Sequence, residues 1–351
     1  MKIFAFYLPQ FHCIPENDKW WGKGFTEWTN LKAARPLFKG HTIIHPYNDN
    51  YYNLLNRTTI EWQTNTMTDY GIDGLIYYHY YFKGKHLLEK PEENLLKWKD
   101  INQKFFFCWA NHSWRRTWEG KQEILMPMEY GDKDDWEKHF EYLLPFFKDL
   151  RYEKKNNKPL FMLFKYDFKE KNEMLQFFDL RAKQEGFDGI CIIETDMGID
   201  SDDFQNKKSP LTEYTYLRDP GREVNDIRKK NKRIDRRILW KISRLIKYND
   251  IAVFDGEKIL IKKIENLNKQ SDIIHGLLFE WDNTSRHKNK GYIITPFSYE
   301  TFIEYMNKIQ DEEYLFINAW NEWCEGMVLE PTKEKGYKYL EWIQDWKSKK
   351  K

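Results

Sequence analysis

Two glutamates three positions apart carry the clearest chemical signal in this chain. Glu322 and Glu325 lie in the segment Trp320–Gly326, directly after the apolar run Tyr314–Ile317. Carboxylates are rarely buried in a protein unless they are paired or take part in function. The neighbouring indole rings offer apolar platforms for the C–H faces of a sugar, and amides can hydrogen-bond its hydroxyls. The segment therefore predicts a carbohydrate site with its own acid and base.

Cleavage of a glycosidic bond usually needs two carboxyl groups, one to protonate the leaving oxygen and one to attack or to activate an attacker. Separations of about 5–5.5 Å favour retention and about 6.5–9.5 Å favour inversion. Residues i and i+3 are neighbours on a helix or tight turn, so Glu322 and Glu325 can face one side. Trp320 and Trp323 can raise the pKa of an acid by desolvating it. The alternative is a strand end with two exposed glutamates and indoles that only pack.

Short apolar runs alternate with longer amphipathic ones along the chain, and these elements must position the two acids. Strands are expected at 3–8, 74–81, 104–110, 159–165, 189–194, 211–217, 273–279 and 314–319. Helices are expected at 58–70, 134–148, 170–185, 298–310 and 335–347. This alternation predicts a mostly parallel α/β sheet with both faces covered. Eight strands favour a single catalytic (β/α)8 TIM barrel over residues 1–351, with a doubly wound open sheet as the alternative.

Polar residues gather at the ends of the predicted strands, which is where a barrel carries its active site. We expect an aromatic groove at this mouth, formed by Tyr7, Trp28, Tyr78, Trp109, Trp114, Trp281, Trp320 and Trp323. We expect contacts to the sugar hydroxyls from Glu27, Asn30, His79, Asn111, His112, Asp282, Asn283 and Asn318. Strand ends also border polar loops in any protein, but here Trp, Asn, His and acids recur while Ser, Gly and Lys do not.

Two long connections interrupt the alternation. Residues 10–56 are rich in aromatic residues and Pro, and long loops in compact domains are usually functional. Residues 218–272 form an insertion whose core, 228–247, is strongly basic and spaced like an amphipathic helix. Such a basic face is either a solvated outer surface or a peripheral contact with an anionic membrane or a lipid-linked phosphate.

Bulk composition excludes several classes of protein. The net charge of +2 predicts no nucleic-acid partner. Cys13, Cys108, Cys191 and Cys324 are scattered, which argues against a zinc knuckle or a disulfide framework and fits a reducing compartment. No stretch approaches the roughly 18 apolar residues of a membrane span, and the chain begins directly with a strand-like run. We therefore expect a soluble cytoplasmic protein.

At these residues the chain resembles the WbsX-like proteins of bacterial surface-polysaccharide loci, which are related to glycoside hydrolase family 99. The resemblance covers nearly the whole chain. The matching stretches are Phe6–His12, Pro15–Asp18, Trp20–Asn30, Tyr70–Gly74, Leu87–Pro91, Cys108–Asn111, Trp281–Thr284 and Asn318–Gly326. The resemblance implies a (β/α)8 barrel, and for family 99 it implies retaining action on α-mannosides with no metal or other cofactor. The implied partner is an oligosaccharide or a lipid-linked polysaccharide.

The Asn-Glu-Trp-x-Glu-Gly motif of family 99 is similar to Asn321–Gly326. The resemblance implies that Glu322 is a base that helps the sugar 2-hydroxyl attack its own anomeric carbon, which gives a 1,2-anhydro sugar. Glu325 is then the general acid/base at the leaving oxygen. One departure affects the substrate: WbsX-like chains usually read Trp-Ala-Asn-Glu-Asn-Trp, whereas residues 109–114 place His112 at the position of the acid.

Two other functions are compatible with the sequence. A metal-dependent glycosyltransferase needs a D-x-D motif at a strand end, for which Asp200–Asp202 is the candidate, and no glycine-rich phosphate loop accompanies it. His79, His112 and Asp282 could also hold a metal, although polar residues around a sugar explain them more simply. A non-catalytic sugar-binding protein would keep the aromatic residues but need not keep both glutamates. The joint presence of the two glutamates favours an enzyme, and the resemblance to family 99 implies a metal-independent retaining hydrolase or transglycosylase.

Overall fold

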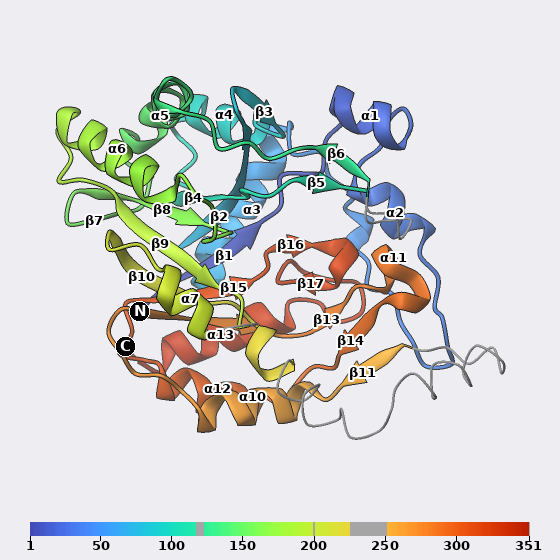
Figure 1. Ribbon diagram of the computed structural model, residues 1–351. Helices are drawn as coiled ribbons and strands as arrows, with labels where there is room; N and C mark the ends of the chain where they lie inside the picture. The colour runs from blue at the N-terminus through green and yellow to red at the C-terminus, as the bar shows by residue number, and fades with distance from the viewer. Residues whose placement is uncertain (117–122, 199–200, 225–250, 351) are drawn as a thin grey trace, which may run out of the picture.

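The computed structural model describes residues 1–116, 123–198, 201–224 and 251–350 (Figure 1). Its centre is a closed barrel of parallel strands in which β1 pairs with both β15 and β2. In chain order the strands are β1 (Lys2–Tyr7), β2 (Gly74–Phe82), β4 (Phe105–Trp109), β8 (Lys158–Leu163), β9 (Cys191–Asp196), β10 (Thr212–Leu217), β12 (Ile273–Leu278) and β15 (Tyr314–Asn318). Each falls on a predicted strand, so the predicted (β/α)8 barrel is confirmed and the open sheet is excluded.

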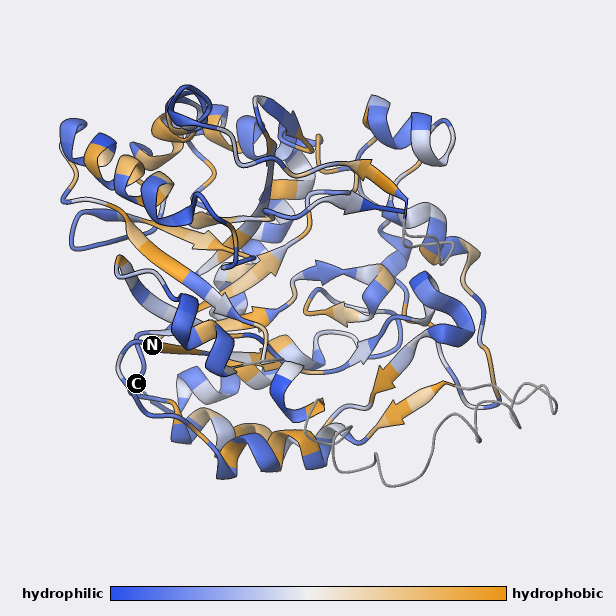
Figure 2. Ribbon diagram, viewed as in Figure 1, coloured by the Kyte–Doolittle hydropathy of each residue, from blue (hydrophilic) through white to orange (hydrophobic). Residues whose placement is uncertain are grey.

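Helices follow the strands and cover the outside of the barrel. They are α3 (Arg57–Tyr70), α4 (Lys90–Lys97), α5 (Lys133–Phe147), α6 (Lys171–Gln184), α7 (Ser201–Lys207), α10 (Gly256–Glu265), α12 (Tyr299–Lys308) and α13 (Lys338–Ser348). Figure 2 shows hydrophobic residues along the strands and an alternation of hydrophobic and hydrophilic residues along α10 and α12. That pattern is expected of helices with one face on the sheet and one face in water.

Five of these helices match predicted ones, and three differ from the prediction in an informative way. The helices α4 and α7 are short, with few turns in which a helical period can show. The helix α10 lies inside the expected insertion 218–272, so part of that insertion is the barrel's own helical layer. The basic segment 228–247 lies outside the described residues.

Aromatic side chains fill the interior of the barrel. Phe4 contacts Phe106 with 5.2 Å between ring centroids, and Phe6 lies 5.4 Å from Tyr216. Phe316 lies 5.3 Å from Tyr216. Because side chains alternate between the two faces of a strand, the residues next to Phe4 and Phe6 point outward to the helices. The interior below the mouth is therefore packed rather than open.

The long connection after β1 contains structure of its own: α1 (Pro15–Trp21), α2 (Glu27–Ala33) and the short 3-10 helix η1 (Tyr47–Asp49). Short strands decorate the barrel as β3 (Lys85–Leu87), β5 (Trp114–Arg115), β6 (Ile124–Met126), β7 (Lys154–Lys155), β11 (Ala252–Phe254), β13 (Trp281–Asp282) and β14 (Tyr292–Ile294). Within the described ranges, no helix has the length and apolar character needed to cross a bilayer.

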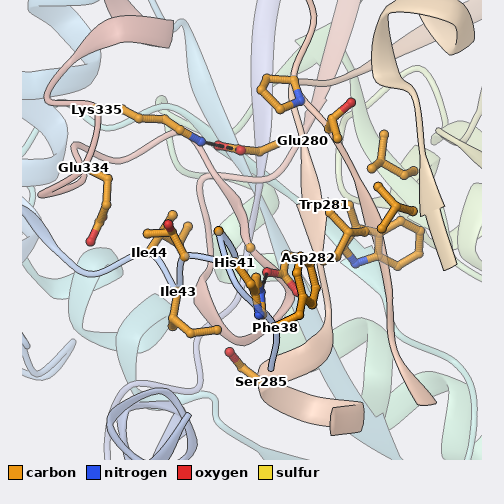
Figure 3. Close-up of a pocket in the computed structure, with 18 of the residues that line it drawn as sticks. Phe38, His41, Ile43, Ile44, Glu280, Trp281, Asp282, Ser285, Glu334 and Lys335 are labelled. Carbon is orange, nitrogen blue, oxygen red and sulfur yellow. Dashed lines mark hydrogen bonds and ion pairs between the residues drawn. The ribbon is translucent and has the colours of Figure 1, made fainter. Parts of the chain in front are cut away.

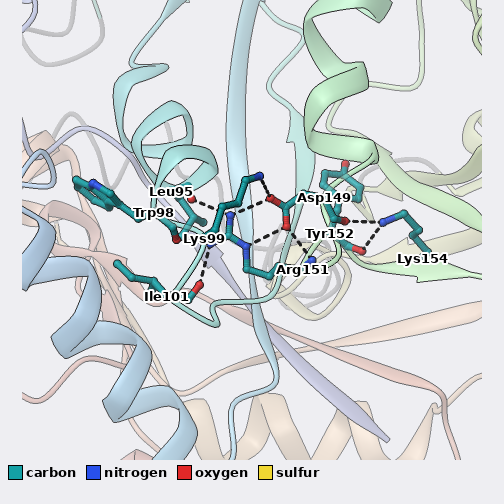
Figure 4. Close-up of polar contacts among 8 residues, drawn as sticks. All are labelled: Leu95, Trp98, Lys99, Ile101, Asp149, Arg151, Tyr152 and Lys154. Carbon is teal, nitrogen blue, oxygen red and sulfur yellow. Dashed lines mark hydrogen bonds and ion pairs between the residues drawn. The ribbon is translucent and has the colours of Figure 1, made fainter.

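A buried ionic network ties together the amino-terminal end of the barrel (Figure 4). Two guanidinium nitrogens of Arg151 donate to the Asp149 carboxylate at 2.9 Å, and Lys99 donates to the same group at 2.6 Å. The remaining donors of Arg151 go to the carbonyl oxygens of Leu95, Trp98 and Ile101, each at 2.8 Å. The network joins the connection before β4 to the connection before β8.

Candidate active site

The glutamate motif forms a tight hairpin directly after β15. Its elements are β16 (Asn321–Glu322), the 3-10 helix η4 (Trp323–Glu325) and β17 (Met327–Val328). The Asn321 amide anchors this hairpin to the end of β1, since it accepts from Leu8 N at 2.7 Å and donates to Leu8 O at 3.1 Å. Gly326 has a φ of 61°, and a Cβ there would lie 2.9 Å from the Asp282 nitrogen. Glycine therefore lets the hairpin turn against β13.

Glu322 and Glu325 line one cavity of about 310 Å3 at the carboxyl ends of the barrel strands. The other lining residues are Leu8, Gln10, Tyr78, Tyr80, Phe82, Ala110, His112, Ser113, Trp114, Arg115, Phe164, Arg218 and Arg286. Aromatic rings thus surround two acids and several cations. This combination of apolar surface and a few polar groups is typical of small-molecule sites.

Arg286 links two acids on the wall of the cavity. It lies on α11 (Thr284–His287) and forms ion pairs with Glu325 and, at 3.1 Å, with Glu27 on α2. The Glu27 side chain is fully buried, and burial raises the pKa of its carboxyl although Arg286 opposes the rise. Arg286 therefore holds the Glu325 carboxylate in place and connects it to the first long loop.

The two motif glutamates stand in different electrostatic surroundings. Burial raises the pKa of the Glu322 carboxyl to about 8, and the negative charge of Glu325 adds to the rise. Arg286 and Arg218 act in the opposite direction. Glu322 lies outside ion-pair distance of both arginines, whereas Glu325 has the guanidinium of Arg286 beside it. Near neutral pH the pair can therefore hold one proton and one negative charge.

Three residues predicted to contact the sugar point away from the cavity. Tyr7 donates to Gln63 on α3 at 2.9 Å, and His79 contacts His139 on α5 at 2.9 Å between ring nitrogens. Trp109 donates to Tyr81 O at 3.1 Å and is buried. Each lies one position from an inward-facing residue, so the alternation of the strand turns it toward the helices.

Three predicted indoles lie behind the motif rather than along the cavity. Trp320 is fully buried, and Trp28 donates to Tyr52 O at 2.7 Å. Trp323 donates to the buried carboxylate of Glu330 at 2.9 Å, and its ring centroid lies 5.7 Å from that of Trp28, with the two planes tilted by 50°. None of these three rings lines the cavity with the two glutamates, so the aromatic residues around that cavity are not the set that was predicted.

Three of the asparagine amides that were predicted to contact sugar hydroxyls form hydrogen bonds with backbone groups. Asn111 both donates to Lys165 O at 2.8 Å and accepts from Lys165 N at 2.7 Å. Asn283 accepts from Tyr292 N at 2.8 Å, and Asn318 donates to Asp219 O at 3.3 Å. Asn30 is half-buried on α2.

Trp281 and Asp282 line a second, more apolar cavity of about 440 Å3 (Figure 3). Asp282 pairs with His41 at 2.7 Å, and a second pair joins Glu280 to Lys335. Isoleucines from β14 and from the first long loop form much of the wall. Trp323 and Gly326 also line this cavity, so it adjoins the motif from the opposite side. We place the chemistry in the first cavity because only that cavity is lined by both motif acids.

Of the predicted aromatic and polar residues, Tyr78, His112 and Trp114 line the cavity with the two glutamates. Four further residues that the sequence prediction did not include line the same cavity: Tyr80, Phe164, Arg218 and Arg286. A signal existed for two of them. Tyr80 lies two positions after Tyr78 and so shares its face, and Arg218 directly follows a predicted strand.

The metal alternatives are not assembled in the described part of the chain. His79 lies in the helical layer, His112 in the first cavity and Asp282 beside His41, so these three do not converge. No other group of three His, Cys, Asp or Glu side chains within the described ranges could hold a metal ion. Asp200 of the D-x-D candidate lies outside those ranges.

The structure defines a (β/α)8-barrel protein with a pair of acids in a cavity at the carboxyl ends of its strands. The GH99 endo-alpha-mannosidase from Bacteroides thetaiotaomicron has the same fold, with a TM-score of 0.56, 13% identity and coverage of 99% of this chain and 96% of that one. A glycoside hydrolase-like protein matches with a TM-score of 0.57 at 11% identity, over 98% of this chain and 93% of its own.

The chain belongs to the family described as Glycosyltransferase WbsX, whose model matches residues 3–343. The WxcX protein of Xanthomonas campestris pv. campestris strain B100 is 28% identical over 363 residues, which cover 97% of this chain. WxcX from strain ATCC 33913 is 28% identical over 366 residues. The chain spans about half the length of these relatives, 48% in each case.

Proposed function

We propose that this chain is a carbohydrate-active enzyme of bacterial surface-polysaccharide metabolism that breaks a glycosidic bond with retention of configuration. The observation that carries the proposal is the pairing of Glu322 and Glu325 in one cavity with unlike surroundings. One carboxyl can hold a proton at neutral pH while the other is ionised, which is what acid–base cleavage of a glycoside requires. The family assignment and the GH99 fold support the same class of substrate.

In the proposed first step, the 2-hydroxyl oxygen of the sugar bonds to its own anomeric carbon while the bond to the leaving oxygen breaks. One carboxylate takes the 2-hydroxyl proton, and the protonated carboxyl gives its proton to the leaving oxygen. In the second step, water or an acceptor hydroxyl opens the 1,2-anhydro sugar and the two protons return. We assign Glu322 as the carboxylate that takes the 2-hydroxyl proton and Glu325 as the carboxyl that protonates the leaving oxygen. This assignment requires the proton to reside on Glu325 once substrate is bound.

Transfer is the second candidate, because the family description names a glycosyltransferase. The same two carboxyls serve both outcomes, since an acceptor hydroxyl can replace water in the second step. We propose capsule or O-antigen oligosaccharides, free or lipid-linked, as the substrate class. The product of the second step distinguishes hydrolysis from transfer.

The test replaces each acid by its amide in the otherwise unchanged chain. Glu322→Gln and Glu325→Gln keep the shape and remove the proton chemistry, so turnover of the producing bacterium's surface oligosaccharide should fall by at least about 10²-fold. Oligosaccharide binding, measured by calorimetry, should survive. Glu300→Gln, at an exposed position on α12, is the matched control. Unchanged turnover in both active-site variants would show that the pair is structural.

A further inference from the structure

Arg218 places a positive charge inside the active-site cavity, and no described acid pairs with it. It follows β10 directly and lines the same cavity as Glu322. Its hydrogen bond goes to the Tyr78 hydroxyl, at a distance of 3.3 Å. Among the residues that the structure describes, no carboxylate lies within ion-pair distance of it. A guanidinium has five N–H donors, and toward the described residues Arg218 uses one of them, for the Tyr78 hydroxyl.

Two aromatic rings pack against this guanidinium. Its central carbon lies 4.6 Å from the centroid of the Phe164 ring and 5.7 Å from that of Phe6. His112 packs against the same Phe164 ring at 5.1 Å, and the Lys165 ammonium lies 5.9 Å from it. Arginine on aromatic faces is pre-organised, and less entropy is lost when it binds a planar anion.

The acids of the cavity do not supply the missing counter-charge. Glu325 is already paired with Arg286. Burial raises the pKa of Glu322 to about 8, so in the ligand-free site at pH 7 this carboxyl offsets only part of the charge of Arg218. Burial, together with the charge of Arg218, lowers the pKa of Lys165, whose ammonium therefore feels the same unbalanced positive field. This side of the cavity favours a negative group on a ligand.

We propose that Arg218, flanked by Phe164 and with His112 and Lys165 beside it, binds an oxyanion carried by the saccharide, either the carboxylate of a uronic acid or a phosphate ester. This inference deepens the proposed function, on which its relevance to turnover rests, by making the substrate an acidic glycan. Arginine recognises both oxyanions through paired N–H donors, and charge-assisted hydrogen bonds of this kind are about twice as strong as neutral ones.

A different role for Arg218 would be to tune Glu322 alone. Arg218 lowers the pKa of that carboxyl through space, which needs no contact with a ligand. The two roles predict different results. Tuning alone would make removal of Arg218 shift the pH profile while acidic and neutral sugars bind equally, whereas recognition would make the loss specific to acidic sugars.

The experiment compares the binding of matched sugars by ligand-observed NMR and calorimetry at pH 7. The probes are D-glucuronate and D-galacturonate for the carboxylate, α-D-glucose 1-phosphate for the phosphate, and D-glucose and D-galactose as neutral controls. The intact chain should prefer an acidic probe over its neutral counterpart by at least tenfold. Arg218→Met should abolish that preference and leave neutral binding unchanged, and Arg218→Lys should restore part of it.

Lys308→Met removes an exposed positive charge on α12 and serves as the matched control. Thermal melting checks that each variant is folded, and Arg218→Lys replaces Arg218→Met if the latter is not. Equal binding of acidic and neutral probes, or equal weakening of both in the folded variant, would overturn the inference. Because the assay needs no turnover, an acidic preference without any cleavage would refute the proposed function and leave the inference standing.

Discussion

The proton shared between Glu322 and Glu325 decides what the site can do at a given pH. Two interacting carboxyls titrate as a pair, so each macroscopic pKa belongs to both. Arg286 forms an ion pair with Glu325, and burial raises the pKa of Glu322 to about 8. In the ligand-free site the proton is therefore favoured on Glu322. For Glu325 to act as the acid, bound substrate must move Arg286 away from it or neutralise the charge of Arg286.

This charge distribution predicts the alkaline limb of the pH profile. Below about pH 8 the pair keeps one proton, and as the pH rises through about 8 that proton is lost from Glu322. Two carboxylates then remain, with no acid for the leaving oxygen. We expect kcat/KM to fall tenfold per pH unit above that range, measured on an oligosaccharide substrate.

The Glu325→Gln variant provides an independent check, because it removes the negative neighbour that helps to raise the pKa of Glu322. Carboxyl ¹³C NMR should find that pKa lower than in the intact chain. A kcat/KM that stays constant from pH 7 to pH 10 would contradict the shared-proton account.

At the scale of elements, the hairpin after β15 is positioned by contacts to the start of the chain. Asn321 bonds both backbone groups of Leu8, and Trp320 N donates to Phe6 O at 2.7 Å. The Glu330 carboxylate, which follows the hairpin in the chain, accepts from the Tyr52 hydroxyl at 2.8 Å and from the Trp323 indole N–H at 2.9 Å. The first and last barrel strands thus fix the two glutamates together.

Asn321→Ala should loosen the hairpin. It leaves a buried N–H and a buried carbonyl of Leu8 without partners, which costs about 1–3 kcal/mol of unfolding free energy. Activity should fall further than stability, because the glutamates lose their anchor. Chemical denaturation and turnover at saturating substrate measure the two effects. Unchanged stability and unchanged turnover in the alanine variant would contradict the anchoring role.

The periodicity of the sequence predicted all eight strands, and the motif predicted where the two glutamates lie. It did not predict which face each strand-end residue takes. Tyr7, His79 and Trp109 stand one residue from inward-facing positions, and a shift of one residue exchanges the two faces of a strand. Arg286 could not be predicted because α11 is a single turn whose direction depends on the packing of β13 against the hairpin.

In the whole molecule, the cavity with the paired glutamates and the Arg151–Asp149 network lie at opposite ends of the barrel. The cavity opens at the carboxyl ends of the strands, while Arg151, Asp149 and Lys99 join connections at the amino ends. This division is expected of (β/α)8 barrels. Burial alone would raise the pKa of Asp149, but hydrogen bonds from Arg151 and Lys99 more than offset this and hold it below its usual value.

Arg151→Met should destabilise the fold by about 3–5 kcal/mol, because it leaves a buried carboxylate with weaker compensation. The pKa of Asp149 is depressed in the folded state, so its contribution is fully present above the unfolded value of about 3.9 and is lost as the pH falls through the lower folded value. The stability difference between the intact chain and the variant should therefore shrink below about pH 4. Denaturation at pH 7 and pH 3.5 tests this, and an equal difference at both would contradict it.

The anomer formed first during cleavage distinguishes retention of configuration from inversion. ¹H NMR during cleavage of the surface oligosaccharide records that anomer before mutarotation mixes the two forms. The account predicts a first-formed product with the same anomeric configuration as the bond that was cleaved. A first-formed product of inverted configuration would contradict the anhydro-sugar route and the roles given to Glu322 and Glu325.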